Sequence, residues 1–345
     1  MQVIDLDERQ LRTCQPLGSS PRFRVPDASA FRLMAMNRHW PLALKLACIL
    51  IGLAASRRLA AEADSRTLVH DGKSRSYILH LPKASSKDQP MPLVLVLHGA
   101  GATGAMTQAL TGFDRLADKH TFAVAYPDGI NKVWNYASVR RLQALKKGGG
   151  TDDVGFLKAL IDELVRDGTV DKHRVYATGI SNGAYMSNRL ALDASDRIAA
   201  VAPVAGTMGK FGAERTKADR PMPVLYIHGT DDKLVSFEGV DFITKRALSL
   251  SANDFVDWWA KQNGCDKNAG IELLPDVADD GVTVKRHTFE DKRGRAPVVF
   301  YEVVGGGHTW PGGKLQPESL LGKTCRDFNA SEVIWEFFRQ HSSPE

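Results

Sequence analysis

Residues 174–192 read RVYATGISNGAYMSNRLAL. The first part, RVYAT, has the β-branched and aromatic content of a strand, and the part from Asn182 onward has helical spacing. Between them, Gly179-Ile180-Ser181-Asn182-Gly183 fits the pattern G-x-S-x-G. In a strand–turn–helix setting this pattern predicts a nucleophile elbow, a tight and strained turn that lifts a serine hydroxyl clear of the sheet. The alternative is an ordinary N-cap serine, but the flanking segments favour a nucleophile.

A serine hydroxyl needs a base to activate it, and the base needs an acidic partner. After an elbow of this kind, the acidic residue comes next along the chain and the histidine comes last. The segment PVLYIHGTDD, 223–232, is an apolar strand followed by a turn that carries two aspartates. We favour Asp232 as the acid because it stands at the far side of the turn, and we interpret Asp231 as a turn residue. His228 is expected only to order the turn.

The histidine is predicted in YEVVGGGHTWPGG, residues 301–313, where a strand leads into a glycine-rich loop. His308 follows both Ser181 and Asp232, as the chain order requires. The other histidines of the folded part precede the serine, sit in the turn before Asp232 or lie within a predicted strand or helix. We therefore expect His308 to take the proton of Ser181, with a hydrogen-bonded loop histidine as the alternative.

An oxyanion hole is expected in the turn after the first buried strand, within LVLVLHGAGATG, 93–104. The backbone N–H of Ala100 is the favoured donor in this turn, and that of Gly101 is the alternative. The second donor is the backbone N–H of Asn182, directly after the nucleophile. HGAG without a following Lys-Ser or Lys-Thr does not fit a phosphate-binding loop.

Apolar runs alternate with amphipathic segments along the chain, which predicts an α/β fold with a mostly parallel sheet and helices on both faces. We expect one catalytic domain at 62–345. The expected strands are 67–69, 76–81, 93–97, 122–126, 174–179, 198–204, 223–229, 282–288 and 298–304. The expected helices are 105–119, 154–165, 182–192, 255–262 and 331–341.

The N-terminal part differs from the rest. Residues 1–35 show no helix or strand period and are expected to be an unstructured extension, or an over-read upstream of a true start at Met36. Residues 36–61 combine basic residues, a short apolar run and a small-residue end, which predicts a signal peptide cleaved near Ala61 or Ala63. A buried helix or an uncleaved anchor is the alternative. The protein is therefore expected to be secreted or periplasmic, without stable membrane insertion.

The charge of the chain is +5 overall. Residues 1–61 contain nine Lys and Arg and four Asp and Glu, so the remainder holds 36 of each sign and is neutral. A neutral domain does not support binding to nucleic acid or to an anionic membrane surface. The histidines also lack the H-x-x-x-H spacing of a zinc site, so we expect neither a metal nor a cofactor.

Two of the four cysteines, Cys265 and Cys325, lie in the predicted catalytic domain. An even pair in an exported protein suggests a disulfide between them, with two separate thiols as the alternative.

Together the motifs LVLVLHGAGATG, AYPDGINKVWN, GTDDVGFLKALID, VYATGISNGAYMSNRLA, PVLYIHGTDD and GGGHTWPGG resemble the secreted polyhydroxybutyrate depolymerase and feruloyl-esterase-like branch of the α/β-hydrolases. The resemblance extends over about residues 65–342. It implies an α/β-hydrolase fold, export, action on carboxylic esters and the same triad. It also implies that Trp134 lies near the pocket, with a packing role as the alternative.

The resemblance places Asp152 and Asp153 near the pocket as well, although an N-cap role is favoured for Asp153. We also expect Trp310 to contact substrate. No separate polymer-binding domain is expected after the last predicted helix, which shifts the expectation toward soluble oligomers or small esters.

These observations favour a secreted serine esterase that forms an acyl-enzyme, acting on polyhydroxybutyrate-type oligoesters or polyesters. A feruloyl or acetyl esterase of plant polysaccharides is the alternative. A peptidase or a non-catalytic binding module of the same fold is less favoured. The sequence leaves the acyl group and the oligomeric state open.

Overall fold

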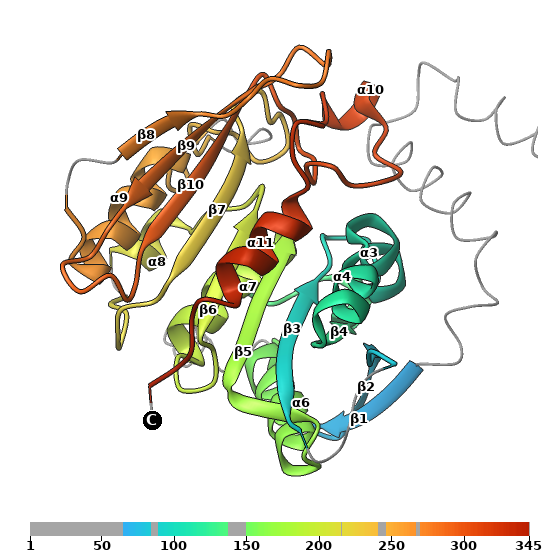
Figure 1. Ribbon diagram of the computed structural model, residues 1–345. Helices are drawn as coiled ribbons and strands as arrows, with labels where there is room; N and C mark the ends of the chain where they lie inside the picture. Colours follow the sequence, from blue (N-terminus) through green and yellow to red (C-terminus); the bar gives the residue numbers. More distant parts are fainter. Residues whose placement is uncertain are drawn as a thin grey trace, which may run out of the picture. The chain divides into compact units, whose positions relative to one another are not determined.

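The computed structural model describes residues 65–83, 89–136, 150–214, 216–240, 246–266 and 270–344 (Figure 1). The predicted extension at 1–35 and the predicted signal peptide at 36–61 lie outside these residues.

The described strands are β1 (Ser65–His70), β2 (Lys73–His80), β3 (Met91–Leu97), β4 (Ala123–Pro127), β5 (Val170–Ile180), β6 (Ala200–Val204), β7 (Val224–Gly229), β8 (Gly270–Leu273), β9 (Thr283–Phe289) and β10 (Val298–Val304). The helices are α3 (Gly104–Thr111), α4 (Phe113–His120), the 3-10 turn η1 (Ile130–Lys132), α6 (Asp153–Arg166), α7 (Asn182–Asp193), α8 (Lys210–Ala213), α9 (Ala252–Asn263), α10 (Glu318–Leu321) and α11 (Ala330–Phe338).

All ten described strands join one sheet in the order β1-β2-β4-β3-β5-β6-β7-β10-β9-β8. The six strands from β4 to β10 in this order are parallel to one another, and the pairs at both edges are antiparallel. The carboxyl ends of β3, β5, β7 and β10 therefore meet at one edge, where open α/β sheets bind their ligands. Each of these four strands leads into one of the predicted site loops.

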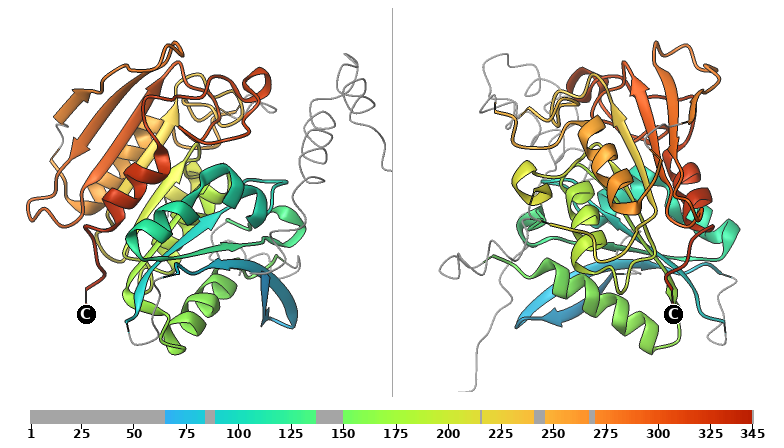
Figure 2. Two further views of the ribbon diagram at one scale, coloured as in Figure 1. Left: turned by 45° about the vertical axis from the view of Figure 1, so that its right-hand side comes forward. Right: turned by 90° about the vertical axis from the view of Figure 1, so that its left-hand side faces the viewer.

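The sheet separates two hydrophobic cores. Alternate side chains of β3 serve opposite faces: Leu93, Leu95 and Leu97 lie in one cluster, and Val94 and Val96 lie in the other. The first cluster is completed by apolar residues of α6, α7 and α9, and the second by those of α4 and α11. Figure 2 shows these helices on the two sides of the sheet. The predicted sheet with helices on both faces is confirmed.

The expected helix at 105–119 is wrong in one respect, because it consists of two helices. Gly112 adopts φ 66°, a left-handed conformation that ends α3 and lets the chain turn into α4. Strand β8 was not expected; its four residues are exposed, and it forms the edge of the sheet beside β9. Within the described part of the chain, the helices are too short or too polar to cross a bilayer.

The expected disulfide between Cys265 and Cys325 is also wrong, because both residues are free thiols in the structure. Cys265 packs against the core that contains Leu93, whereas Cys325 is fully buried in the core that contains Val94. The sheet thus lies between them. A disulfide requires Cα atoms within about 7 Å of each other, which this placement does not allow.

We expect the two thiols to remain unlinked in the purified protein. Peptide mapping without reduction should yield the peptides of Cys265 and Cys325 separately, and a reductant should leave the melting temperature unchanged. The control is the same digest after reduction, which should give the same two peptides. A linked peptide pair would contradict the separation of the cysteines by the sheet.

Candidate active site

Ser181 lies in the turn between β5 and α7, at the edge where the parallel strands end (Figure 1). Its backbone has φ 58° and ψ −121°, a region that non-glycine residues rarely adopt. Its N–H donates to the carbonyl of Val204 at 3.0 Å. The Ser181 side chain makes no capping hydrogen bond to α7, so it does not act as an ordinary N-cap. The hydroxyl is held away from the helix by the strained turn.

The two glycines of G-x-S-x-G allow this turn to pack tightly. A Cβ atom on Gly183 would lie 2.1 Å from the carbonyl oxygen of Leu97, and one on Gly179 would lie 2.7 Å from the carbonyl carbon of Gly183. Neither distance is compatible with a side chain. The start of α7 therefore packs closely against the ends of β3 and β5. This packing holds Ser181 in its strained conformation.

Asp232 follows β7 and is fully buried at its side chain. One carboxylate oxygen accepts the backbone N–H groups of Leu234 and Val235, at 2.9 and 2.8 Å. The other lies 2.7 Å from Nδ1 of His308. Burial by itself raises the pKa of Asp232, but the interactions with His308 and His228 outweigh burial and lower the pKa well below its usual range.

Asp231 is exposed, and its N–H bonds to the carbonyl of Gly306. The contact from His308 thus goes to Asp232, the favoured one of the two adjacent aspartates.

The loop that carries His308 is tied to the turn that carries Asp232. The N–H of Thr230 donates to the carbonyl of Val303, and Gly305 N–H donates to the hydroxyl of Thr230. On its other side, His308 N–H bonds to the carbonyl of Leu321 at the end of α10. The His308 side chain is only 8% exposed. Its ring is therefore fixed from both sides, with Nδ1 on the carboxylate and Nε2 left for another partner.

The turn after β3 is ordered by His98, which is completely buried. Gly129 N–H donates to its Nε2 at 2.9 Å, so Nδ1 carries the proton and donates to the carbonyl of Gly99 at 2.8 Å. Burial lowers the pKa of His98, which keeps this neutral form. Gly101 N–H is already used, since it donates to the carbonyl of Lys132. Ala100 is exposed, and its N–H has no hydrogen-bond partner among the described residues.

Asn182 connects the elbow to this turn through its side chain. Its carbonyl oxygen accepts the backbone N–H of Trp134 at 2.6 Å, and its amide donates to the carbonyl of the same residue at 3.2 Å. The Trp134 ring, 3% exposed, lies 4.9 Å from the ring of His98 and donates its N–H to the His98 carbonyl. This pairing was not foreseen from the sequence, because it joins residues 48 positions apart.

The expectation that Trp134 and Trp310 contact substrate is not supported by their burial. Trp134 packs beneath the turn after β3, which is the alternative considered for it. Trp310 is completely buried beside Phe113, with its N–H on the hydroxyl of Ser331. It anchors the far end of the His308 loop to α11.

Asp152 rather than Asp153 caps α6, by accepting the N–H of Gly155. Asp153 is instead completely buried and pairs with Arg75 at 2.7 Å. It also accepts the N–H of Asn135 at 2.7 Å. The buried ion pair thereby fixes the segment next to Trp134. Asp153 thus supports the site and does not cap the helix.

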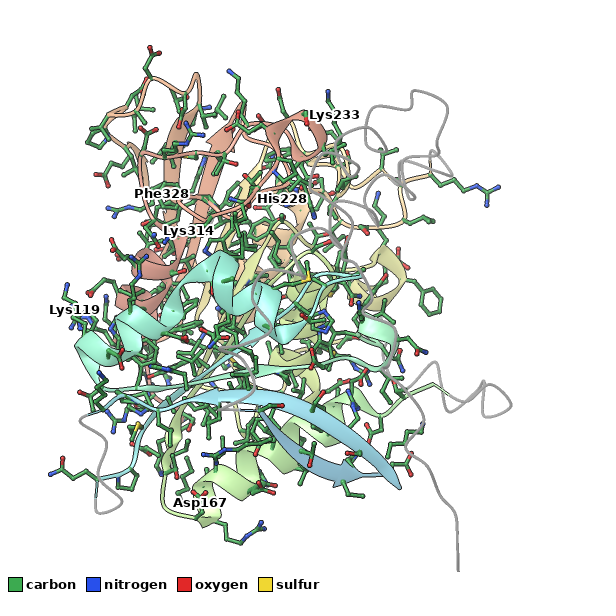
Figure 3. All side chains as sticks on the ribbon, turned by 90° about the vertical axis from the view of Figure 1, so that its right-hand side faces the viewer. Lys119, Asp167, His228, Lys233, Lys314 and Phe328 are labelled. Atoms are coloured by element: carbon green, nitrogen blue, oxygen red, sulfur yellow. The ribbon has the colours of Figure 1, made fainter. Side chains whose placement is uncertain are left out.

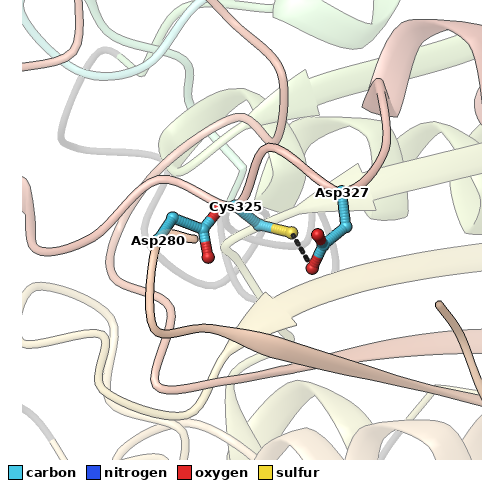
Figure 4. A group of neighbouring side chains, drawn as sticks. All are labelled: Asp280, Cys325 and Asp327. Atoms are coloured by element: carbon cyan, nitrogen blue, oxygen red, sulfur yellow. Dashed lines mark hydrogen bonds between the residues drawn. The ribbon is translucent and has the colours of Figure 1, made fainter. Parts of the chain in front are cut away.

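One group of three metal-ligating side chains occurs in the described residues: Asp280, Cys325 and Asp327, with ligand atoms within 4.8 Å of one another (Figure 4). The carboxylates already accept backbone N–H groups, those of Val277 and Ala278 at Asp327 and that of Arg326 at Asp280. Burial raises the pKa of the Cys325 thiol to about 12, which disfavours the thiolate that binds metals. We infer that this group holds the loop before β9 against the segment before α11.

Comparison with known proteins agrees with this architecture. A sequence model of the family described as Esterase PHB depolymerase matches residues 75–216. The putative esterase NocK of Nocardia uniformis subsp. tsuyamanensis is 32% identical over 294 residues, covering 81% of this chain and 84% of that protein. Feruloyl esterase B of Piromyces equi is 26% identical over 78% of this chain, which spans 46% of that longer protein.

The acetyl xylan esterase from Aspergillus awamori has a similar fold, with a TM-score of 0.52 at 15% identity over 80% of this chain and 98% of that one. These likenesses confirm the α/β-hydrolase fold and the resemblance stated from the motifs. The chain belongs to the esterase family of polyhydroxybutyrate depolymerases and feruloyl esterases, and it is a carboxylic ester hydrolase.

Proposed function

We propose that the protein is a serine esterase in which Ser181 is the nucleophile, His308 the general base and Asp232 its orienting acid. The observation that carries this proposal is the 2.7 Å contact between His308 Nδ1 and the buried carboxylate of Asp232. A carboxylate on Nδ1 fixes the tautomer whose Nε2 lone pair accepts a proton, and it stabilises the imidazolium that forms. The strained elbow at Ser181 supports the assignment of the nucleophile.

The reaction then proceeds in two halves. Ser181 Oγ attacks the ester carbonyl carbon while its proton passes to Nε2 of His308. The tetrahedral intermediate collapses, the C–O bond to the alcohol breaks, and the same proton leaves with the alcohol. Water repeats the sequence on the acyl-enzyme and releases the acid. We infer that the N–H groups of Ala100 and Asn182 bind the negative oxygen in both halves, because Gly101 N–H is bound elsewhere.

For the substrate we propose a hydroxyalkanoate oligoester or polyester, which is the class named by the matching family. A ferulate or other aromatic acyl ester is the second candidate, and one contact favours it. The ring of Tyr185, one helical turn after Ser181, lies 4.8 Å from the ring of Tyr136. Helical side chains lean toward the helix N-terminus, here toward Ser181. Tyr136 is 44% exposed and could stack on a planar acyl group.

We also propose that the mature enzyme is exported and begins after residue 61, on the basis of the signal-peptide layout at 36–61.

A matched ester panel tests the activity and the substrate class together. The purified protein should hydrolyse at least one of a 3-hydroxybutyrate trimer, methyl ferulate and a series of p-nitrophenyl esters. Ser181→Ala should lose more than about 1000-fold in kcat because the covalent route is removed. Highest kcat/KM on the trimer supports the first substrate class. A ferulate preference that Tyr136→Ala removes and Tyr136→Phe retains supports the second. Equal turnover by wild type and Ser181→Ala would contradict the mechanism.

Asn182→Ala should lower kcat about tenfold with little change in KM, since it releases the backbone of Trp134 and loosens the oxyanion turn. Steady-state kinetics on the best ester measure this, with thermal melts alongside. Gln262→Ala is the matched control, because it also removes a side-chain acceptor from a backbone N–H, that of Ala218, at a distance from the elbow. If both variants lower stability equally and neither changes kcat, the supporting role of Asn182 is wrong.

N-terminal sequencing of the exported protein should give a start at or just after residue 61. The full-length chain in a cell lysate serves as the control. A secreted protein that retains Met36 would count against the proposed cleavage.

A further inference from the structure

The triad carboxylate has a second histidine beside it. His228, the penultimate residue of β7, is fully buried at its side chain, and its Nε2 lies 3.4 Å from the Asp232 oxygen that His308 also contacts. The same Nε2 lies 2.8 Å from the carbonyl oxygen of Val235. Figure 3 shows His228 inside the molecule, while Lys233 of the following turn reaches the surface.

The protonation of His228 follows from its partners. The Val235 carbonyl can only accept a hydrogen bond, so Nε2 of His228 carries a proton. Nδ1 faces the hydroxyl of Tyr226, which is completely buried. Burial raises the pKa of Tyr226 well above its usual value, so the hydroxyl keeps its proton and can donate a hydrogen bond to Nδ1. This arrangement matches a proton on Nε2, the ring nitrogen that faces Val235 and Asp232.

The structure assigns to His228 the role of a positioning residue for the triad: its Nε2–H, which donates to the Val235 carbonyl, lies 3.4 Å from the Asp232 carboxylate and offsets part of the negative charge that this carboxylate presents to His308. This inference rests on the proposed function. Val235 closes the arrangement, because its carbonyl accepts from His228 while its N–H donates to Asp232. The side chain of His228, at the start of the turn, therefore helps to fix the carboxylate of Asp232 at the end of the turn.

The electrostatic consequence has a definite sign. The titratable groups around His228 are Tyr226 on the same strand, Asp232 in the following turn and His308 in the neighbouring loop; Tyr185 of α7 acts on Tyr226. The N–H dipole of a neutral His228 reduces the negative charge that Asp232 offers to a protonated His308. Removing this dipole leaves more negative charge on Asp232 facing His308, so the acid limb of kcat/KM should move to higher pH.

A purely structural role predicts something different. If His228 only fills space and holds the Val235 carbonyl, its replacement should lower stability and the amount of active enzyme. The pH dependence of the remaining activity would then stay where it is in the wild type.

The matched variants are His228→Gln, which can keep an N–H donor near the position of Nε2, and His228→Met, which has similar bulk and no donor. We expect His228→Met to move the acid limb of kcat/KM upward by about half a pH unit or more and to lower kcat about tenfold. His228→Gln should remain close to the wild type. Titrating a methyl ester in a pH-stat avoids a pH-dependent chromophore.

An unchanged acid limb in His228→Met, with activity that follows the folded fraction, would overturn the inference. Should His228→Met fail to fold, nitrogen NMR of histidine-labelled wild-type protein decides, because His228 must be the neutral tautomer with the proton on Nε2. A proton on Nδ1 instead would also overturn it. Failure of the proposed function is visible separately, as wild-type protein that neither hydrolyses esters nor is labelled at Ser181 by a phosphonate.

Discussion

The strained backbone of Ser181 is the constraint on which the site is built. A left-handed conformation at a serine costs on the order of 1–3 kcal/mol and persists only where its surroundings enforce it. Here the enforcement comes from close packing, since the glycines on either side bring α7 against the carbonyl oxygen of Leu97. In the proposed mechanism this one strained turn supplies both the nucleophile, Ser181, and an oxyanion donor, the N–H of Asn182.

The second requirement is an ionised carboxylate in a buried place. Burial alone would favour the neutral acid at Asp232. The ionised form is stabilised by two backbone N–H groups of the turn, by the hydrogen bond with His308 and by the nearby Nε2 of His228. The two histidines next to one carboxylate oxygen of Asp232 have different roles. His308 lies on a loop at the catalytic edge, whereas His228 is fixed on β7 and is bound at both of its nitrogens. Only the first can exchange its outer proton with a substrate.

The sequence was sufficient where the signal is local or follows chain order. The elbow is readable because strand, turn and helix are contiguous, and Asp232 and His308 follow from the order of elements and from turn chemistry. What it missed depends on contacts between distant segments. The clamp of Asn182 on Trp134, the burial of Trp310 against α11 and the pair between Arg75 and Asp153 leave no periodic pattern. The disulfide prediction was wrong for the same reason, because cysteine spacing does not indicate which face of a sheet each residue occupies.

Two of these distant contacts, the clamp of Asn182 on Trp134 and the pair between Arg75 and Asp153, support the segment beside the turn after β3, which explains why Trp134 is buried. An oxyanion hole is effective when its donors already point at the developing charge and need not reorganise. In the turn after β3, His98 binds the Gly99 carbonyl, Gly101 N–H is bound to Lys132, and Trp134 supports the His98 carbonyl from below. Each of these groups is satisfied within the protein, whereas the N–H of Ala100 has no partner among the described residues. The aromatic side chain of Trp134 thus holds the turn in place.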